Sequence, residues 1–176
     1  MEKTKRIEDQ EYMGDQTLTE YTVEEGVEEI GESAFCGCKN LKKVTISRGV
    51  LRIGRRAFCR TGLTEVTLKE GVEEIGDGAF CRCYSLERVV LVKGIRKIGD
   101  YAFGGNEKLT ELEIHEGVNE IGKEIVEDTS LHTITRPLRP RPLSLIHISE
   151  PTRRYALSNA VFCLKKKRGG GGGGGG

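Results

Sequence analysis

Three short sequence markers recur along this chain with a shared period of 22 or 23 residues. The first is a Leu followed by alternating apolar positions, as in Leu-Lys-Lys-Val-Thr-Ile; the second is Gly-Val-x-x-Ile-Gly, and the third is Ala-Phe. The first marker begins at Leu18, Leu41, Leu63, Leu86, Leu109 and Leu131. Markers that stay in phase over so many units predict a solenoid, in which each unit is one coil and packs only on its neighbours.

Within a coil, the spacing of the apolar residues indicates which side chains form the core. Val44 and Ile46 are expected to point to one side of a short strand, and Lys43 and Thr45 to the other, because side chains alternate along a strand. The second marker lines another wall of the coil, its final Gly is expected to permit a sharp turn, and Ala-Phe plugs the return. The sequence therefore predicts short parallel β-strands stacked about 4.8 Å apart, with turns or short helical segments as returns. Six such strands would form a rod of roughly 30 Å.

The markers resemble those of the BspA-like, or type-5, leucine-rich repeat over residues 7–135. The resemblance also rests on a Cys or Asn three residues after the Phe, at Cys38, Cys83 and Asn106. One repeat instead has Thr61, and the fifth replaces Ala-Phe by Ile-Val. The resemblance implies a leucine-rich-repeat solenoid, often bacterial and often at the cell surface, that binds proteins or other macromolecules. It implies no enzymatic activity.

The register of the repeats divides the chain into four segments. Residues 1–17 are a partial N-terminal coil with Tyr12 in the Phe position, and residues 18–135 are five full repeats and the start of a sixth. Residues 136–142, rich in Pro and Arg, are ambiguous. Residues 143–176 match the translation of a transposase-type sequencing adapter followed by runs of Lys and Gly. We therefore expect that tail to be non-native and disordered, and the natural C-terminus to lie outside this chain.

Charged residues one period apart are expected to stack in columns along the rod. One column alternates in sign through Glu20, Lys43, Glu65, Arg88 and Glu111. Two further columns alternate in the same phase: Glu25, Arg48, Glu70, Lys93, Glu116, and Glu28, Glu29, Arg52, Glu73, Glu74, Arg96, Lys97, Glu120. Opposite charges on neighbouring strands are favourable and like charges are not, so this alternation disfavours a register slip by one coil.

The outward side of the strands is the candidate binding face, made of Lys43, Thr45, Glu65, Thr67, Arg88, Val90, Glu111 and Glu113. A nucleic-acid-binding surface would be a basic stripe of one sign, whereas the charges of this face neutralise one another. Its small, mostly uncharged column suits a protein or glycan partner. No stretch approaches the ~20 apolar residues that span a bilayer, so no membrane partner is expected. The alternative interpretation is a solvated face with no partner.

No catalytic, cofactor-binding or metal-binding residue is identified in the sequence. His115, His132 and His147 accompany no recognisable Ser or Cys nucleophile motif, and there is no Gly-rich phosphate-binding loop. The pairs Cys36-Gly-Cys38 and Cys81-Arg-Cys83 lie two coils apart, about 9–10 Å by strand spacing, which disfavours a shared zinc ion.

Three cysteines, Cys36, Cys59 and Cys81, share one column in successive coils. Adjacent members are expected to be near enough for a disulfide, whose Cα atoms lie ~4.4–6.8 Å apart. The chain shows no secretory signal, which favours reduced thiols, but the sequence leaves their redox state open.

The function predicted from the sequence is a non-enzymatic leucine-rich-repeat scaffold for protein–protein or other macromolecular interaction. Two alternatives stay open: a fragment of a cell-surface adhesin, and the repeat region of a larger multidomain enzyme. The N-terminus lacks the apolar run of a secretory signal, so the sequence by itself favours the cytoplasm, whereas the resemblance implies the cell surface.

Overall fold

A computed structural model describes residues 5–115, 117–131 and 133–135. The Pro- and Arg-rich segment and the tail expected to be non-native lie outside the described residues, as do Glu116, His132 and His147. The described part of the chain consists of strands and turns, without helices, so the returns of the coils are turns. The predicted solenoid of short parallel strands is confirmed.

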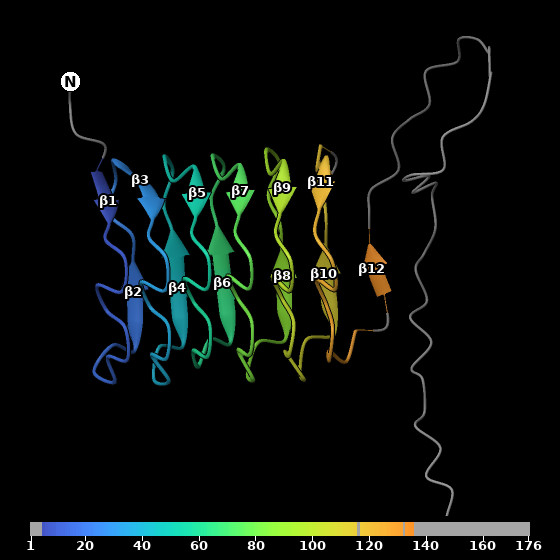
Figure 1. Cartoon of the computed structure of the whole chain (residues 1–176), viewed down its shortest axis with the longest axis horizontal. Helices are drawn as coiled ribbons and strands as arrows, with labels where there is room; N and C mark the ends of the chain where they lie inside the picture. Colours follow the sequence, from blue (N-terminus) through green and yellow to red (C-terminus); the bar gives the residue numbers. More distant parts are fainter. Residues whose placement is uncertain (1–4, 116, 132, 136–176) are drawn as a thin grey trace, which may run out of the picture.

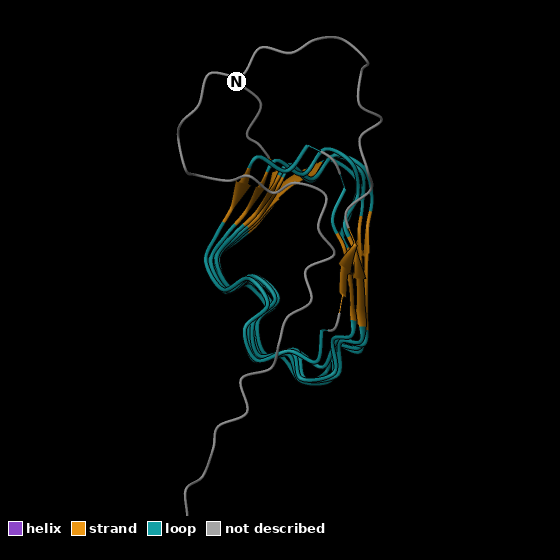
Figure 2. Cartoon of the chain, turned by 90° about the vertical axis from the view of Figure 1, so that its right-hand side faces the viewer, coloured by secondary structure: helices purple, strands orange, loops and turns teal. Residues whose placement is uncertain are grey.

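Each coil contributes one strand to each of two parallel sheets, which run along the two long sides of a rod (Figure 1). Sheet A has the order β1 (Lys5–Ile7), β3 (Val27–Ile30), β5 (Arg52–Ile53), β7 (Glu74–Ile75), β9 (Lys97–Ile98) and β11 (Glu120–Ile121). Sheet B has the order β12 (Thr133–Thr135), β10 (Glu111–Glu113), β8 (Arg88–Val90), β6 (Glu65–Leu68), β4 (Lys43–Ile46) and β2 (Glu20–Thr22). Viewed along the rod, the coils superpose and enclose one continuous core (Figure 2).

The strands pair with a shift of one sequence period, so equivalent residues of successive coils lie side by side. In sheet B, Lys43 pairs with Glu65 and Val44 with Val66, and Glu65 pairs in turn with Arg88. The predicted column from Glu20 to Glu111 is therefore present in the structure. The apolar and polar sides of the strands are also as predicted, because Val44 is buried and Lys43 is exposed.

Stacked aromatic rings form the centre of the core. Phe35, Phe58, Phe80 and Phe103 are at most 1% exposed, and the centroids of successive rings are 5.1, 5.2 and 5.7 Å apart. Tyr12 extends the stack at 5.0 Å from Phe35, which confirms that it occupies the Phe position of the first coil. Each Ala-Phe marker thus buries a ring against the ring of the next coil, where one coil by itself would leave it in water.

The two glycines of the second marker serve different purposes. Gly71 has a φ of +127°, a conformation that L side chains rarely adopt. Gly76, which follows the Ile, has no such φ; a Cβ there would lie 2.8 Å from the backbone N of Arg55 in the previous coil. Gly54 and Gly99 are equally close to the coil before them, with nearest atoms at 2.7 and 2.4 Å. The sequence-based explanation of this glycine as a sharp turn was therefore wrong: close approach of neighbouring backbones is what excludes a side chain.

The Cys or Asn three residues after Phe35, Phe80 and Phe103 is buried and donates to a main-chain carbonyl of the preceding coil. Cys38 Sγ lies 2.9 Å from the carbonyl oxygen of Tyr12, and Cys83 Sγ lies 3.2 Å from that of Phe58. Asn106 donates to the carbonyls of Phe80 and Phe103 at 2.9 and 2.8 Å, and it accepts from the Cys83 N–H at 2.6 Å. This position therefore faces the core, and both residue types can donate there.

Candidate functional site

The predicted binding face is the outer surface of sheet B, over β4, β6, β8 and β10. Its four charged positions in the strand-entry column are all exposed: Lys43, Glu65, Arg88 and Glu111. Lys43 Nζ lies 3.1 Å from Glu65 Oε1, and Arg88 Nε lies 3.0 Å from Glu111 Oε2. The first contact raises the pKa of Lys43, because the neighbouring carboxylate favours its charged form. The face is consequently a row of neighbouring opposite charges with no region of a single sign.

A second column of small side chains runs beside these charges. Thr67 is exposed, while Thr45, Val90 and Glu113 are half-buried. Thr45 pairs with Thr67, and Val90 pairs with Glu113, so the structure brings all the predicted face residues onto one continuous surface. Whether this surface binds a partner stays a prediction.

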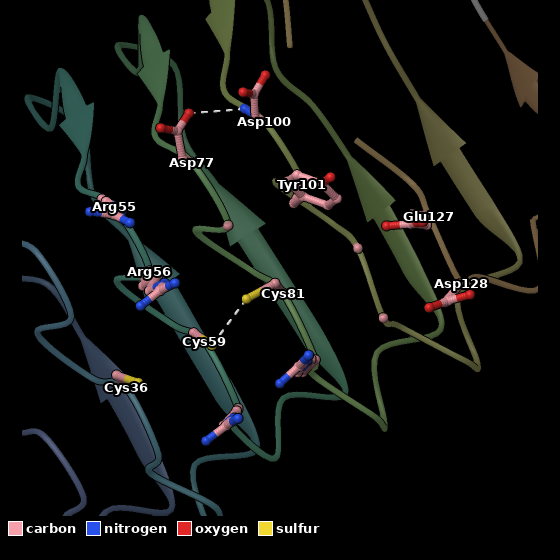
Figure 3. Close-up of a pocket in the computed structure, with 15 residues that line it drawn as sticks. Cys36, Arg55, Arg56, Cys59, Asp77, Cys81, Asp100, Tyr101, Glu127 and Asp128 are labelled. Carbon is pink, nitrogen blue, oxygen red and sulfur yellow. Dashed lines mark hydrogen bonds between the residues drawn. The ribbon is translucent and has the colours of Figure 1, made fainter. Parts of the chain in front are cut away.

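A groove runs along a different side of the rod, over the return segments between sheet A and sheet B. It has a volume of about 620 Å³ and crosses successive coils. Its lining residues are Cys36, Arg55, Arg56, Cys59, Arg60, Asp77, Gly78, Cys81, Arg82, Asp100, Tyr101, Gly104, Gly105, Glu127 and Asp128. Arginines and thiols occupy one end of the groove and carboxylates the other (Figure 3).

The groove is shaped by a repeated backbone conformation. In the returns, the third and seventh residues after the Ile of the second marker adopt positive φ, as at Arg56 and Arg60 with φ of 52° and 57°. The N–H groups of the third, fifth and seventh residues donate to carbonyls of the next coil. Arg60 N, for example, lies 2.9 Å from the carbonyl oxygen of Cys81. This third ladder of hydrogen bonds holds the returns in register beside the two sheets.

Three arginines of the groove occupy these left-handed positions, which glycine fills in some of the other coils and residues such as Ser33, Tyr101 and Asp128 fill in the rest. Arg60 and Arg82 correspond to Gly37 and Gly105, and Arg56 corresponds to Gly78 of the next coil. A side chain costs roughly 1 kcal/mol in this conformation relative to Gly. Within the described residues, Arg56, Arg60 and Arg82 form no ion pair, and all three are exposed. Their charges therefore remain available to an anion.

The three cysteines of the predicted column lie side by side at the floor of the groove. Cys59 and Cys81 have their Sγ atoms 3.0 Å apart, and all three thiols are free (Figure 3). The side-chain hydrogen bond with Cys59 lowers the pKa of Cys81. The same interaction, together with burial, raises the pKa of Cys59. Burial raises the pKa of Cys36.

Sequence reasoning identified the cysteine column but missed the arginines beside it. Arg60 and Arg82 each appear in the sequence as the residue after a column cysteine, in a place where other coils have Gly. The presence of Arg at a position that is Gly in other coils was the signal that could have identified these residues. Its meaning becomes clear only when the φ of this position is known. Among the described residues, no group of His, Cys, Asp and Glu forms a metal site, and no helix is long and apolar enough to cross a membrane.

Comparison with known proteins gives one family and several related structures. The family model of the BspA type leucine rich repeat region matches residues 5–132 in six copies. The chain is similar to a solved leucine-rich repeat protein from Eubacterium ventriosum, with 30% identity and a TM-score of 0.65 over 70% of this chain and 33% of that one. A second, from Bacteroides ovatus, has 27% identity and a TM-score of 0.62 over 70% of this chain and 34% of that one.

A leucine rich cell surface protein from Faecalibacterium prausnitzii is also similar, with 32% identity and a TM-score of 0.51 over 75% of this chain and 42% of that chain. No curated protein sequence matches the chain. The chain spans about a third of the length of the Eubacterium ventriosum and Bacteroides ovatus proteins.

Proposed function

Because this chain belongs to the BspA-type leucine-rich-repeat family, we propose that it is a non-enzymatic scaffold that binds a protein through the outer face of sheet B. The observation that carries this proposal is the continuity of that face. Strands β2, β4, β6, β8, β10 and β12 pair without interruption, and the outward side chains of β2, β4, β6, β8 and β10 form one surface along the rod. Family membership and the related structures support a repeat scaffold; the partner and the face are our proposal.

The chemistry of the face favours a protein surface over a polyanion. Lys43 and Arg88 are each paired with a neighbouring glutamate, which leaves few charges free to neutralise phosphates. The adjacent column of threonines supplies hydroxyl groups and methyl groups on a surface fixed by strand pairing. Rigid surfaces of this kind lose little conformational entropy on binding, which favours affinity.

Site-specific photo-crosslinking tests the proposal on the full chain. A photoreactive amino acid replaces Thr67 on the outer face of sheet B, and in a matched control it replaces Arg52, which is exposed on β5 of sheet A. Extract from the organism of origin supplies the partner. We expect a cross-linked protein with Thr67 substituted and none with Arg52 substituted. We also expect Thr45→Arg, which adds bulk beside Thr67, to weaken binding of the identified protein by at least about tenfold. Equal cross-linking from both positions, or from Arg52 alone, would refute the assignment of the face.

The cell-surface adhesin remains the second candidate function, because one similar structure is named as a leucine rich cell surface protein. Its test is fractionation of cells that express the full-length gene, followed by protease shaving of intact cells. Loss of the protein on shaving supports the adhesin, and full protection contradicts it.

A further inference from the structure

Three features that arise separately meet in the groove over the returns of the coils. Two free thiols, Cys59 and Cys81, lie with their Sγ atoms 3.0 Å apart. Arg60 and Arg82 immediately follow these two cysteines and hold a strained backbone conformation, with φ of 57° and 55°. The floor around them is kept open by glycine, since a Cβ at Gly105 would lie 2.9 Å from Arg82 Cγ. Stacking of the coils uses the positive φ everywhere but requires neither the thiol pair nor the arginines, because other coils hold the same conformation with Gly14, Gly37, Gly105 or Asp128.

The arginines at the seventh position of the returns are not needed to form these returns. Glycine fills the equivalent position in three other coils, at Gly14, Gly37 and Gly105 with φ of 77°, 82° and 71°, and Asp128 fills it in a fourth with φ of 51°. Replacing such a glycine by arginine destabilises the fold and adds only an exposed guanidinium. Guanidinium groups bind carboxylates and phosphates through paired N–H donors, so the ligand indicated is an anion.

The thiols add a chemical constraint to that ligand. Equivalent residues of neighbouring coils stack about 4.8 Å apart, which is inside the ~4.4–6.8 Å range of Cα separations in disulfides. The sulfur atoms already face one another across the groove floor, so a bond between them needs side-chain rotation and no movement of the coils (Figure 3). Cys59 is 6% exposed, whereas Cys81 is half-buried and opens to the groove. An incoming reagent therefore meets Cys81 first.

We propose that this groove is a thiol–disulfide exchange site, in which Arg56, Arg60 and Arg82 hold an anionic low-molecular-weight disulfide against Cys81 and Cys59 completes the exchange. The Cys81 thiolate attacks one sulfur of the bound disulfide, which forms a mixed disulfide and releases one thiolate. Cys59 then passes its proton to the first released thiolate and attacks the Cys81 sulfur, which releases the second thiolate; that thiolate takes from water the proton that Cys81 gave up when it ionised. Two protein thiols are oxidised to one Cys59–Cys81 disulfide, and the reagent is reduced by two electrons to two thiols.

The product would be a covalent link between the second and third full coils of the rod. The ladder bond from Arg60 N to the Cys81 carbonyl, at 2.9 Å, already holds these returns together. The link therefore fits the existing register. Cys36, in the coil before, lines the same groove beside Cys59. The pairing of Cys81 with Cys59 distinguishes the proposal from a transfer of the disulfide to Cys36.

Reaction of the reduced full chain with three disulfides of different charge tests the proposal. The probes are oxidised glutathione, which is anionic, hydroxyethyl disulfide, which is neutral, and cystamine, which is cationic. Peptide mass spectrometry after alkylation locates each bond. We expect a Cys59–Cys81 disulfide, formed fastest with oxidised glutathione. In Cys59→Ser we expect glutathione to remain attached to Cys81, because the second step is blocked.

The arginine contribution is tested by Arg60→Gly with Arg82→Gly, a variant that relieves backbone strain and is expected to fold at least as well as the parent. We expect the ratio of the oxidised glutathione rate to the cystamine rate to fall about tenfold, and to approach one in high salt. Arg52→Gln, on β5 of sheet A and outside the groove, is the matched control and should leave that ratio unchanged. A ratio unaffected by the groove arginines, glutathione retained on Cys36, or a stable mixed disulfide in the parent chain would each overturn the proposal.

Discussion

Replacement of Gly76 by alanine tests the reason why the coils can stack as closely as they do. A Cβ at this position would lie 2.8 Å from Arg55 N, 2.9 Å from Gly54 C and 3.0 Å from Ile53 O, all of them backbone atoms of the preceding coil. Backbone atoms held in a ladder cannot rotate away, so the coils must separate locally. The hydrogen bond from Gly76 N to the Ile53 carbonyl, 2.9 Å long, lies at the point of contact.

The expected loss is the sum of overpacking and of weakened ladder bonds. Forcing extra atoms into a packed interior costs about 1–3 kcal/mol, and each stretched hydrogen bond costs about 1 kcal/mol more. We therefore expect Gly76→Ala to lower the free energy of unfolding by about 3 kcal/mol. At roughly 4 °C per kcal/mol for a unit of this size, the melting temperature falls by about 12 °C.

Thermal unfolding followed by circular dichroism measures this effect against a matched glycine. Gly26 has a φ of +85°, and a Cβ added there would have no other atom within 4 Å, so Gly26→Ala reports backbone strain without overpacking. We expect it to cost about 1 kcal/mol. If Gly76→Ala is no more destabilising than Gly26→Ala, close approach between coils is not the reason for the second glycine.

Three further outcomes are expected from the same structure. Asn106→Ala should lower the free energy of unfolding by about 2–4 kcal/mol, since it leaves buried carbonyls unpaired; Asn106→Cys should lose less, and equal losses in chemical denaturation would contradict the assigned role. Lys43→Glu with Arg88→Glu should lower the melting temperature at low salt and lose most of that effect at about 1 M salt; a loss independent of salt would exclude the charge column as its cause. Burial raises the pKa of Cys83 to about 12, above the ~8.5 of a free thiol, so its stabilising contribution is complete below pH ~8.5 and is lost as the pH rises toward 12. Over that pH range, the free energy of unfolding measured by chemical denaturation should decrease faster in the parent than in Cys83→Asn, by roughly 1 kcal/mol for each pH unit. An equal decrease in the two proteins would contradict this.

Much of the fold follows from period alone. A repeat of 22 or 23 residues with alternating apolar positions is enough to specify parallel strands, the core side of each strand and the pairing of Lys43 with Glu65. It also placed Tyr12 in the aromatic stack. These predictions succeed because every coil packs on its neighbours in an equivalent way. The register between two neighbouring coils therefore determines the contacts between all the others.

The candidate sites depend on the structure to different degrees. The outer face of sheet B and the cysteine column both follow from strand period and coil register. The groove does not follow from period and register, because its form depends on residues with positive φ in the returns. A positive φ cannot be predicted from residue types such as Arg60 or Tyr101. The second glycine was misread for a related reason, since Gly76 is required by atoms of another coil and not by its own backbone.

The sequence by itself thus determined the repeat, the two-sided strands and the residues that stack, because periodic burial of apolar side chains admits one arrangement of coils. Only the tertiary structure decided how the returns bend, which brings Arg60 and Arg82 beside the thiols of Cys59 and Cys81 in one groove. The backbone conformation of the returns and the contacts between coils depend on neighbours 22 or 23 residues away in the sequence. The sequence of a single coil therefore does not specify them.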